Sequence, residues 1–473
     1  MLKFVSKRLN TKVTLSAALI VTLLSGCASQ VDTQHEQQKV YTFIDQTSIA
    51  ERLMGEDEID WWHNLKSEQL NQLVDDALLM NHDLRTSQLQ FKSVLARIGA
   101  EEAQFLPQGG AVISAQRSDV VDTTSRQSSA NLAFNWQLDL FGRISALVDA
   151  AQASAMSEAE QGRLLQIEVV SSVVKGYVSY QGHQRKKDII LLQVEALQQS
   201  INVLEALVEE GAANELDLNR TRAQLSQQEA LLPAIAYDQY RDLSTLAILT
   251  GRLTSAVSLQ YDQRLFDLPF RVALAQPSNA IALRPDISRA LYEFSQANSL
   301  SVAASKALLP EVSLSAFAGV LSLGNLHLAD TQQQWQVSPQ IEWSLLSYPA
   351  LIAERDAQQY LSEAAYSDYQ QVVLSAINES ELALQLLVEQ GSLQRYADQR
   401  YYHANNAFLQ AQAMYQEGQV PYLALLDARQ DVLIAEENAV DLTISSLLAK
   451  VNAYKAFNGR WSYELATAQK LKI

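Results

Sequence analysis

The chain of 473 residues has one cysteine, Cys27, and nine prolines. A single cysteine excludes an internal disulfide and a thiolate metal cluster. Proline is absent from two long stretches, residues 144–210 and 353–417, so the strongest helix breaker interrupts neither of them. After Leu24 the chain also lacks a run of about 20 apolar residues, the length of a membrane-spanning helix. If its body crosses a membrane, it must therefore do so with strands.

Sequence motifs of common enzyme classes are missing as well. The chain has no Gly-x-Ser-x-Gly, no His-Glu-x-x-His, no phosphate-binding loop and no Rossmann glycine set. Its six histidines are scattered, and the acidic pairs Glu209-Glu210 and Glu436-Glu437 are typical of solvated helix surfaces. We predict no catalytic residue, no metal site and no cofactor, and we expect that the protein is not an enzyme.

Basic side chains are outnumbered, with 36 Lys and Arg against 53 Asp and Glu and a net charge of −17. Nucleic-acid binding needs a basic face, so this balance argues against such a partner. A solvated surface explains most of the acidity, which would also bias a pore toward cations.

The N-terminus has the features of an export signal. Residues 1–26 combine a basic start with a short apolar core, Val13–Leu24, too short for a stop-transfer helix. The core ends at Leu24-Ser25-Gly26-Cys27, which resembles the bacterial lipoprotein cleavage box. This resemblance implies that Cys27 becomes the first mature residue and carries lipid, which adds membrane affinity. An ordinary signal peptide with an incidental cysteine is the alternative.

The body of the chain is duplicated. Trp136 matches Trp343, and Gly211 matches Gly418, both at an offset of 207 residues. A unit this long is not a solenoid repeat and indicates two equivalent halves. We predict that the halves span residues 71–252 and 284–460, and that residues 27–70, 253–283 and 461–473 contribute to an equatorial belt.

Each half has two stretches with the period-two alternation of a β-strand, near residues 110–118 and 130–139 and near 312–321 and 334–343. About ten alternating residues is the length of a tilted membrane strand, and tryptophans near strand ends match an aromatic girdle. We predict that the apolar face contacts lipid (Leu132, Phe134, Trp136, Trp335, Trp343) and that the polar face lines an outer lumen (Asn131, Asn135, Gln137, Asp139, Gln336, Gln340, Glu342). A two-hairpin sheet on a soluble core is the alternative.

Four strands are too few for a barrel. Known bacterial barrels begin at eight strands, and an open edge in lipid leaves backbone groups unpaired. Strands in a membrane would therefore require several subunits to share one barrel. Three copies would supply twelve strands.

Long helices follow each pair of strands. We predict them at residues 144–210 and 353–417, with return helices at 214–249 and 422–457 and short helices upstream at 83–106 and 286–309. The first carries a heptad seam typical of a coiled coil (Ile190, Val194, Leu197, Ile201, Leu204, Val208). Gly211 and Gly418 supply the left-handed residue that ends a helix. Each half is thus predicted to be a long helix flanked by two stacked short ones, although a soluble helical bundle is the alternative.

These elements resemble the TolC-like outer-membrane factors, in particular the lipoprotein branch that serves resistance-nodulation-division drug pumps. The matching motifs are Asp60-Trp61-Trp62, residues 138–143 (Leu-Asp-Leu-Phe-Gly-Arg), 283–287 (Leu-Arg-Pro-Asp-Ile), Leu309-Pro310, 415–418, 422–429 and Gly459-Arg460-Trp461. Two departures are Asn458-Gly459-Arg460, where the family usually has a run of glycines, and Ser347-Tyr348-Pro349-Ala350, where relatives often have a Gly-rich turn. The resemblance implies a mixed α and β membrane protein: a trimeric twelve-stranded outer-membrane β-barrel continuous with a long periplasmic α-helical barrel and an equatorial belt.

The resemblance also implies a function. The chain would be the exit duct of a tripartite efflux pump in the outer membrane of a Gram-negative bacterium. Its partners would be two further copies, a periplasmic adaptor and an inner-membrane transporter, and its cargo small molecules such as drugs. A duct for type I protein secretion remains an alternative, as does a lipid-anchored coiled-coil scaffold without a pore.

Family gate residues map onto Leu423 and Asp427, which are four residues apart and so share a helix face. Arg220 occupies the position equivalent to Asp427 in the first half, where it would clamp neighbouring hairpins. The alternative is that these are solvated charges that contribute little. The tips around Gly211 and Gly418 would dock the adaptor through helical hairpins.

Overall fold

The computed structural model describes residues 60–120, 123–267, 284–328 and 330–457. The described residues fall into two compact units. The strand unit contains residues 101–150 and 295–362, and the helical unit contains residues 60–100, 151–294 and 363–457. The predicted lipid-bearing Cys27 lies outside the described residues.

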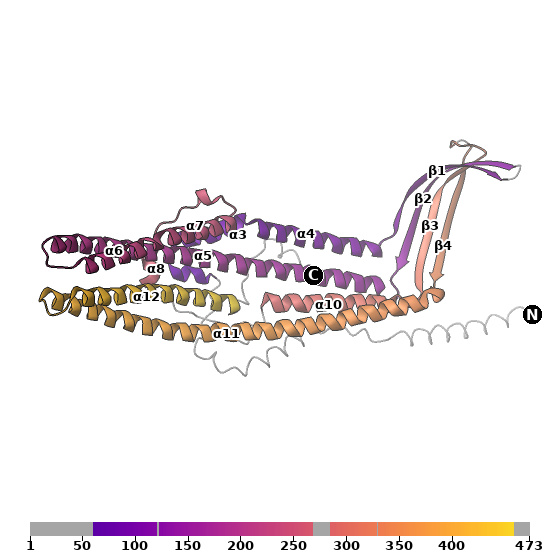
Figure 1. Cartoon of the computed structure of the whole chain (residues 1–473). Coiled ribbons are helices and arrows are strands. Elements are labelled where there is room, and N and C mark those ends of the chain that lie inside the picture. The colour runs from indigo at the N-terminus through magenta and orange to yellow at the C-terminus, as the bar shows by residue number, and fades with distance from the viewer. Residues whose placement is uncertain (1–59, 121–122, 268–283, 329, 458–473) are drawn as a thin grey trace, which may run out of the picture. The chain divides into compact units, whose positions relative to one another are not determined.

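The strand unit holds one antiparallel sheet in the order β1-β2-β3-β4 (Figure 1). Its strands are β1 (Gln108–Val120), β2 (Thr123–Leu138), β3 (Glu311–Leu323) and β4 (Gln332–Glu342). The predicted start of β2, near residue 130, is wrong by seven residues. The segment Thr123–Ser129 lacks apolar alternation, but it pairs residue for residue with β1 and so extends the hairpin.

Long helices dominate the rest of the chain. They are α4 (His82–Glu102), α5 (Arg143–Glu209), α10 (Pro285–Lys306), α11 (Tyr348–Gln416) and α12 (Tyr422–Phe457). Shorter elements are η2 (Trp61–Leu65), α3 (Glu68–Met80), η3 (Ala103–Phe105), α6 (Glu215–Glu229), α7 (Leu231–Leu249), η4 (Thr254–Ala256), α8 (Arg264–Asp267) and η5 (Leu345–Ser347). Among the helices described, none combines the length and the apolar character that a membrane span requires.

Two helical hairpins close at equivalent glycines. Gly211 ends α5 and Gly418 ends α11, and both have a φ of +71°. Beyond each glycine an amide donates back across the last turn, from Ala212 to the Leu207 carbonyl at 2.7 Å and from Gln419 to the Met414 carbonyl at 2.9 Å. This pattern is the Schellman motif, in which glycine avoids the steric cost of the left-handed backbone. The return helices α6 and α12 follow (Figure 1).

The first return helix is divided, which the sequence prediction of one helix at 214–249 missed. Residues Glu215–Glu229 form α6 and Leu231–Leu249 form α7, with Ala230 between them. Pro233 lies in the first turn of α7. Its ring nitrogen has no hydrogen to donate, and proline is tolerated there but not inside a helix.

The helical unit has an apolar core that explains two sequence motifs. Trp61 is buried and stacks on Tyr454, with ring centroids 4.8 Å apart. Arg284 is also buried; it binds Asp286 and Glu379 and donates to the Ala456 carbonyl at 2.9 Å. These two side chains therefore serve packing and the anchoring of a helix end.

Candidate functional site: a two-faced sheet and two helical tips

Strand register sorts the side chains of the sheet onto two different faces. Leu132 lies opposite Ala318, which lies opposite Trp335, so the three share one face. Asn135 lies opposite Ser315, which lies opposite Ser338, on the other face. Because residues directly opposite one another point to the same side, the large apolar residues of β2 and β4 gather on the face of Leu132. The strands β1 and β3 are less strictly sorted, since they place Val112, Phe317 and Leu321 on the other face. The sheet has an apolar face and a polar face.

The apolar face is exposed to an extent that is unusual for large side chains. Exposure is 67% at Leu132, 43% at Phe134, 77% at Trp335 and 52% at Trp343, and Trp136 is half-buried. A contiguous apolar surface of this kind marks a site of interaction with a membrane or another protein.

The polar face is a network of amides and hydroxyls. Gln334 donates from Nε2 to Asn131 Oδ1 at 3.0 Å, and Asn131 donates from Nδ2 to Ser129 Oγ at 3.3 Å. The first bond ties β4 to β2 across β3, where Gly319 leaves room, and the second lies within β2. A Cβ at Gly319 would lie 2.2 Å from Asn131 Oδ1. Polar surfaces made of neutral groups are readily wetted and bind solutes weakly.

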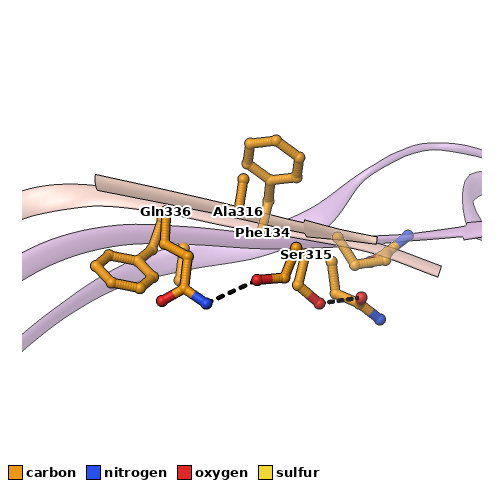
Figure 2. Close-up of a pocket in the computed structure, with 9 residues that line it drawn as sticks. Phe134, Ser315, Ala316 and Gln336 are labelled. Carbon is orange, nitrogen blue, oxygen red and sulfur yellow. Dashed lines mark hydrogen bonds between the residues drawn. The ribbon is translucent and has the colours of Figure 1, made fainter. Parts of the chain in front are cut away.

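A hollow of about 390 Å³ lies against the sheet. Figure 2 shows Ser315 and Gln336 on one side of the sheet and Phe134 and Ala316 on the other. The sequence prediction identified Gln336 and Asn135 but missed Phe317, which also lines the hollow. The sequence did contain a signal for Phe317. In residues 312–321 it occupies one of the positions that alternate with the apolar ones, in line with Ser313 and Ser315.

The two matched tryptophans anchor strand ends to helix ends. Trp136 donates from Nε1 to the Phe105 carbonyl at 2.8 Å, and Trp343 donates to the Leu308 carbonyl at 3.3 Å. Phe105 and Leu308 are themselves separated by 203 residues. The two halves of the chain therefore make equivalent hydrogen bonds, each from a matched tryptophan to a carbonyl near the end of the preceding helix.

Asp139 departs from its predicted place on the lumen wall. It lies just after β2, and its carboxylate accepts the amides of Ile144 at 2.9 Å and Ser145 at 2.8 Å, together with the Ser145 hydroxyl at 2.7 Å. It therefore caps the N-terminus of α5, whose free amides attract a negative charge. Partial burial raises the pKa of Asp139, but the hydrogen bonds from Ser145 and Ile144 outweigh it, and the pKa lies below its ordinary value.

Glu342 ends β4 and lies directly opposite Glu311 on the polar face. Arg143 compensates one of the two charges, with its Nε 3.4 Å from Glu311. Gln137 and Gln340, the remaining predicted lumen residues, lie in register with Ser313 between them. The polar face therefore becomes acidic only at this end of the strands.

The predicted gate residues lie near the helical tips. Leu423 and Asp427 are in the first turns of α12 and are exposed, Leu423 at 36%. Arg220 is exposed on α6. Within one chain Arg220 and Asp427 do not pair with each other or with another described residue.

A half-buried cation, Arg429, lies next to this gate. Arg429 stacks over the Phe408 ring at 6.0 Å and donates to Ser200 Oγ at 3.4 Å. Burial lowers the pKa of Arg429, and the nearby Tyr422 hydroxyl opposes this shift. Tyr422 also meets Tyr415 edge-on, at 5.4 Å between ring centroids, and packs on the seam residues Ile201 and Leu204. Leu423 and Asp427 are therefore exposed on a part of α12 whose neighbouring side chains, Tyr422 and Arg429, are packed against other helices.

Comparison with known proteins agrees with this arrangement. The family model of outer membrane efflux proteins matches residues 73–252 and 276–459. The toluene efflux pump outer membrane protein TtgC of Pseudomonas putida is 28% identical over 97% of this chain and 98% of its own length. The pyoverdine export outer membrane protein OpmQ of Pseudomonas aeruginosa is 25% identical over 85% of this chain and 87% of its own length.

Among solved structures, the outer-membrane channel OprN superposes with a TM-score of 0.82 at 25% identity. The match covers 88% of this chain and 96% of that one. The predicted fold class, four strands joined to long helices in a membrane channel, is confirmed. The predicted outer-membrane location and efflux role are also confirmed at the level of the family, which consists of ducts rather than enzymes. The chain belongs to the outer membrane efflux protein family.

Proposed function

We propose that three copies of this chain form the exit duct of a tripartite efflux pump, with the polar sheet faces lining the outer lumen and the apolar faces against lipid. The observation that carries this proposal is the sorting of side chains by register. Leu132 and Trp335 are left exposed on one face, while Asn131 and Gln334 bond to each other on the opposite face. A sheet that packed its apolar face on its own core would not leave it exposed.

The open sheet edges support an assembly of several subunits. Among the described residues, both β1 and β4 have a partner strand on one side only. Their outer backbone groups would be unpaired in lipid, where each costs several kcal/mol. Pairing of β1 with β4 of the next copy removes every edge, and three copies provide twelve strands.

The helical tips would carry the contacts with the rest of the pump. In the proposed duct, Leu423 and Asp427 form the periplasmic constriction and Arg220 pairs across subunits. The tips at Gly211 and Gly418 dock a periplasmic adaptor that links the duct to an inner-membrane transporter of the resistance-nodulation-division type. Lipid on Cys27 anchors each subunit to the membrane.

Small molecules are the favoured cargo. Relatives matched over nearly their whole length include proteins named for toluene efflux and pyoverdine export. This supports a pump duct over a duct for protein secretion, and over a scaffold without a pore.

The test uses the purified, lipidated full-length chain. Its oligomeric state is measured in detergent, and its conductance is recorded in planar bilayers. A trimer that conducts supports the proposal. A monomer that leaves the bilayer current unchanged would contradict it.

A second measurement separates the two kinds of duct. In a strain that lacks this chain, the accumulation of small toxic compounds inside the cell should rise. Expression of the chain should lower this accumulation to its original level. Unchanged accumulation together with lost secretion of a protein would favour the secretion duct.

A further inference from the structure

Phe317 is the one large aromatic side chain that the described strands place on the polar face. It lies in register with Ala133 on β2 and Gln336 on β4, so it shares their side of the sheet. The large aromatics Phe134, Trp136 and Trp335 belong to the apolar face. An aromatic ring among amides and hydroxyls has no role in the membrane contact.

On β2 and β3 the neighbours of the ring are small side chains, while Gln336 of β4 lies on its other side. Ala133 lies beside it in register, and Ser315 and Gly319 precede and follow it at the same phase of β3. The Asn131 side chain occupies the space over Gly319. These residues leave Phe317 partly exposed within the hollow of about 390 Å³.

The polar groups around the ring keep unused hydrogen-bonding capacity. Asn135 accepts from Ser315 Oγ through Oδ1 at 2.9 Å, and Gln336 donates from Nε2 to Ser338 Oγ at 2.7 Å (Figure 2). The Asn135 amide nitrogen and the Gln336 amide oxygen form no hydrogen bond with another described residue. The hollow therefore offers the Asn135 amide nitrogen as a donor and the Gln336 amide oxygen as an acceptor beside an aromatic ring, and no charged side chain lines it.

We infer that this hollow is a binding site for small uncharged aromatic molecules that carry a hydroxyl or amide group. Such a molecule stacks on Phe317 and hydrogen-bonds to Asn135 and Gln336. The inference rests on the proposed function, because the polar face must line the lumen for a solute to reach it. Binding is weak, as a duct requires, since a solute held too tightly would not leave.

The test measures block of the channel current by two probes of similar size. 4-Hydroxybenzamide has the aromatic ring and both polar groups, and 4-hydroxycyclohexanecarboxamide has the polar groups on a saturated ring. The parent channel should be blocked at lower concentration by the aromatic probe. Aromatic contacts contribute about 0.5–1.5 kcal/mol, which corresponds to a preference of roughly twofold to tenfold.

Three variants identify the side chain responsible. Phe317→Leu should lose the preference, and Phe317→Tyr, which keeps a ring, should retain it. Leu321→Ala is the matched control, because Leu321 lies on the same face of β3 outside the hollow. Trimer content and current without probe are measured for each variant.

Equal block by the two probes, or an unchanged preference in Phe317→Leu, would overturn the inference while leaving the duct intact. A parent chain that carries no current would instead contradict the proposed function, and the binding site with it.

Discussion

At the residue scale, single polar groups fix the joints between strands and helices. Asp139 holds the start of α5, while the second half has no carboxylate at the corresponding joint. There α11 begins after η5 with Pro349 as its second residue, a position where proline is already preorganised. The two halves thus reach the same strand-to-helix turn by different local chemistry.

Removing the Asp139 cap should destabilise the strand unit. Asp139→Ala loses three hydrogen bonds to α5, and loss of a cap costs about 0.5–2 kcal/mol. Asp139→Asn keeps an acceptor oxygen and should lose less. Thermal unfolding of the purified protein measures both. Equal melting temperatures for the parent and the alanine variant would contradict the capping role.

The same carboxylate predicts a pH effect with a definite sign. The pKa of Asp139 is lower in the folded protein than its ordinary value, so its contribution to stability is present above the ordinary pKa of about 3.9. That contribution is lost as pH falls through the lowered pKa. In thermal unfolding, the difference between the parent and Asp139→Asn should therefore shrink under acid conditions. A difference that grows toward low pH would show that the sign is wrong.

The tryptophan anchors predict a contrast between residues of the same type. Trp136→Phe and Trp343→Phe each remove a hydrogen bond to a helix-end carbonyl, at about 0.5–1.5 kcal/mol. Trp335→Phe is the control, because its ring is 77% exposed and it makes no hydrogen bond with another described residue. The melting temperature should fall for the first two variants and change least for the third. Equal changes in all three would indicate that only apolar area matters.

At the element scale, the two return helices differ in what they bury. The α12 helix packs Leu426, Val432 and Leu433 inward, as expected for a coiled coil. The α6 helix buries Leu218 together with the polar residues Thr221, Gln224 and Gln228. The predicted heptad seam on α5 is buried at Ile190, Leu197, Ile201 and Leu204. Ile201 and Leu204 pack with Leu218 of α6 in one apolar cluster.

The buried polar side chains of α6 predict a stabilising substitution. Gln224 is 8% exposed, and neither atom of its amide has a partner among the described residues. An unsatisfied buried group costs about 1–3 kcal/mol, so Gln224→Leu, which is similar in volume, should raise the melting temperature. Gln227→Leu, on the exposed side of the same helix, should not. A lower melting temperature for Gln224→Leu would mean that the amide is satisfied in the assembled protein.

The gate predicts a change in conductance without a change in fold. Asp427→Ala, or Leu423→Ala, removes a side chain from the proposed constriction and should give a leakier channel in planar bilayers. Asp368→Ala is the control, because it removes an exposed carboxylate far from the tips. Conductance that is the same in all variants would count against a constriction at these residues.

How much the sequence predicted depends on whether a feature is periodic. Alternation identified all four strands, and heptad steps and glycines located both hairpins, because these signals repeat along the chain. The prediction from sequence missed three details, each for a specific reason. Pro233 was overlooked as a helix break, the Ser- and Thr-rich start of β2 has no apolar alternation, and the capping role of Asp139 depends on how residues 140–142 turn. Hydrogen-bond partners such as Phe105 for Trp136 are set by tertiary structure.

At the scale of the whole molecule, the central question is how the sheet edges are satisfied. The described part of the chain contributes four strands, with two free edges and an exposed apolar face. A membrane would tolerate the apolar face but not the edges, since unpaired backbone groups are costly in lipid. Closure between subunits is the arrangement that satisfies both.

Engineered cysteines test this closure directly. Ser114→Cys on β1 is combined in turn with Gln332→Cys, Gln334→Cys and Gln336→Cys on β4, all on the polar face. Within one sheet β1 and β4 are separated by two strands, so a disulfide, which needs Cα atoms within about 7 Å, must join different subunits. Oxidation of one of these pairs should yield covalent dimers and trimers on denaturing gels.

The alternating geometry of strands supplies the control. Ala115→Cys points to the apolar face, opposite to the three β4 positions, so its pairs should not cross-link even though it adjoins Ser114. A cross-link with Ala115→Cys but not with Ser114→Cys would place the neighbouring subunit in the wrong register for a shared lumen. Monomers in every combination would mean that β1 and β4 do not meet, and the twelve-stranded closure would have to be abandoned.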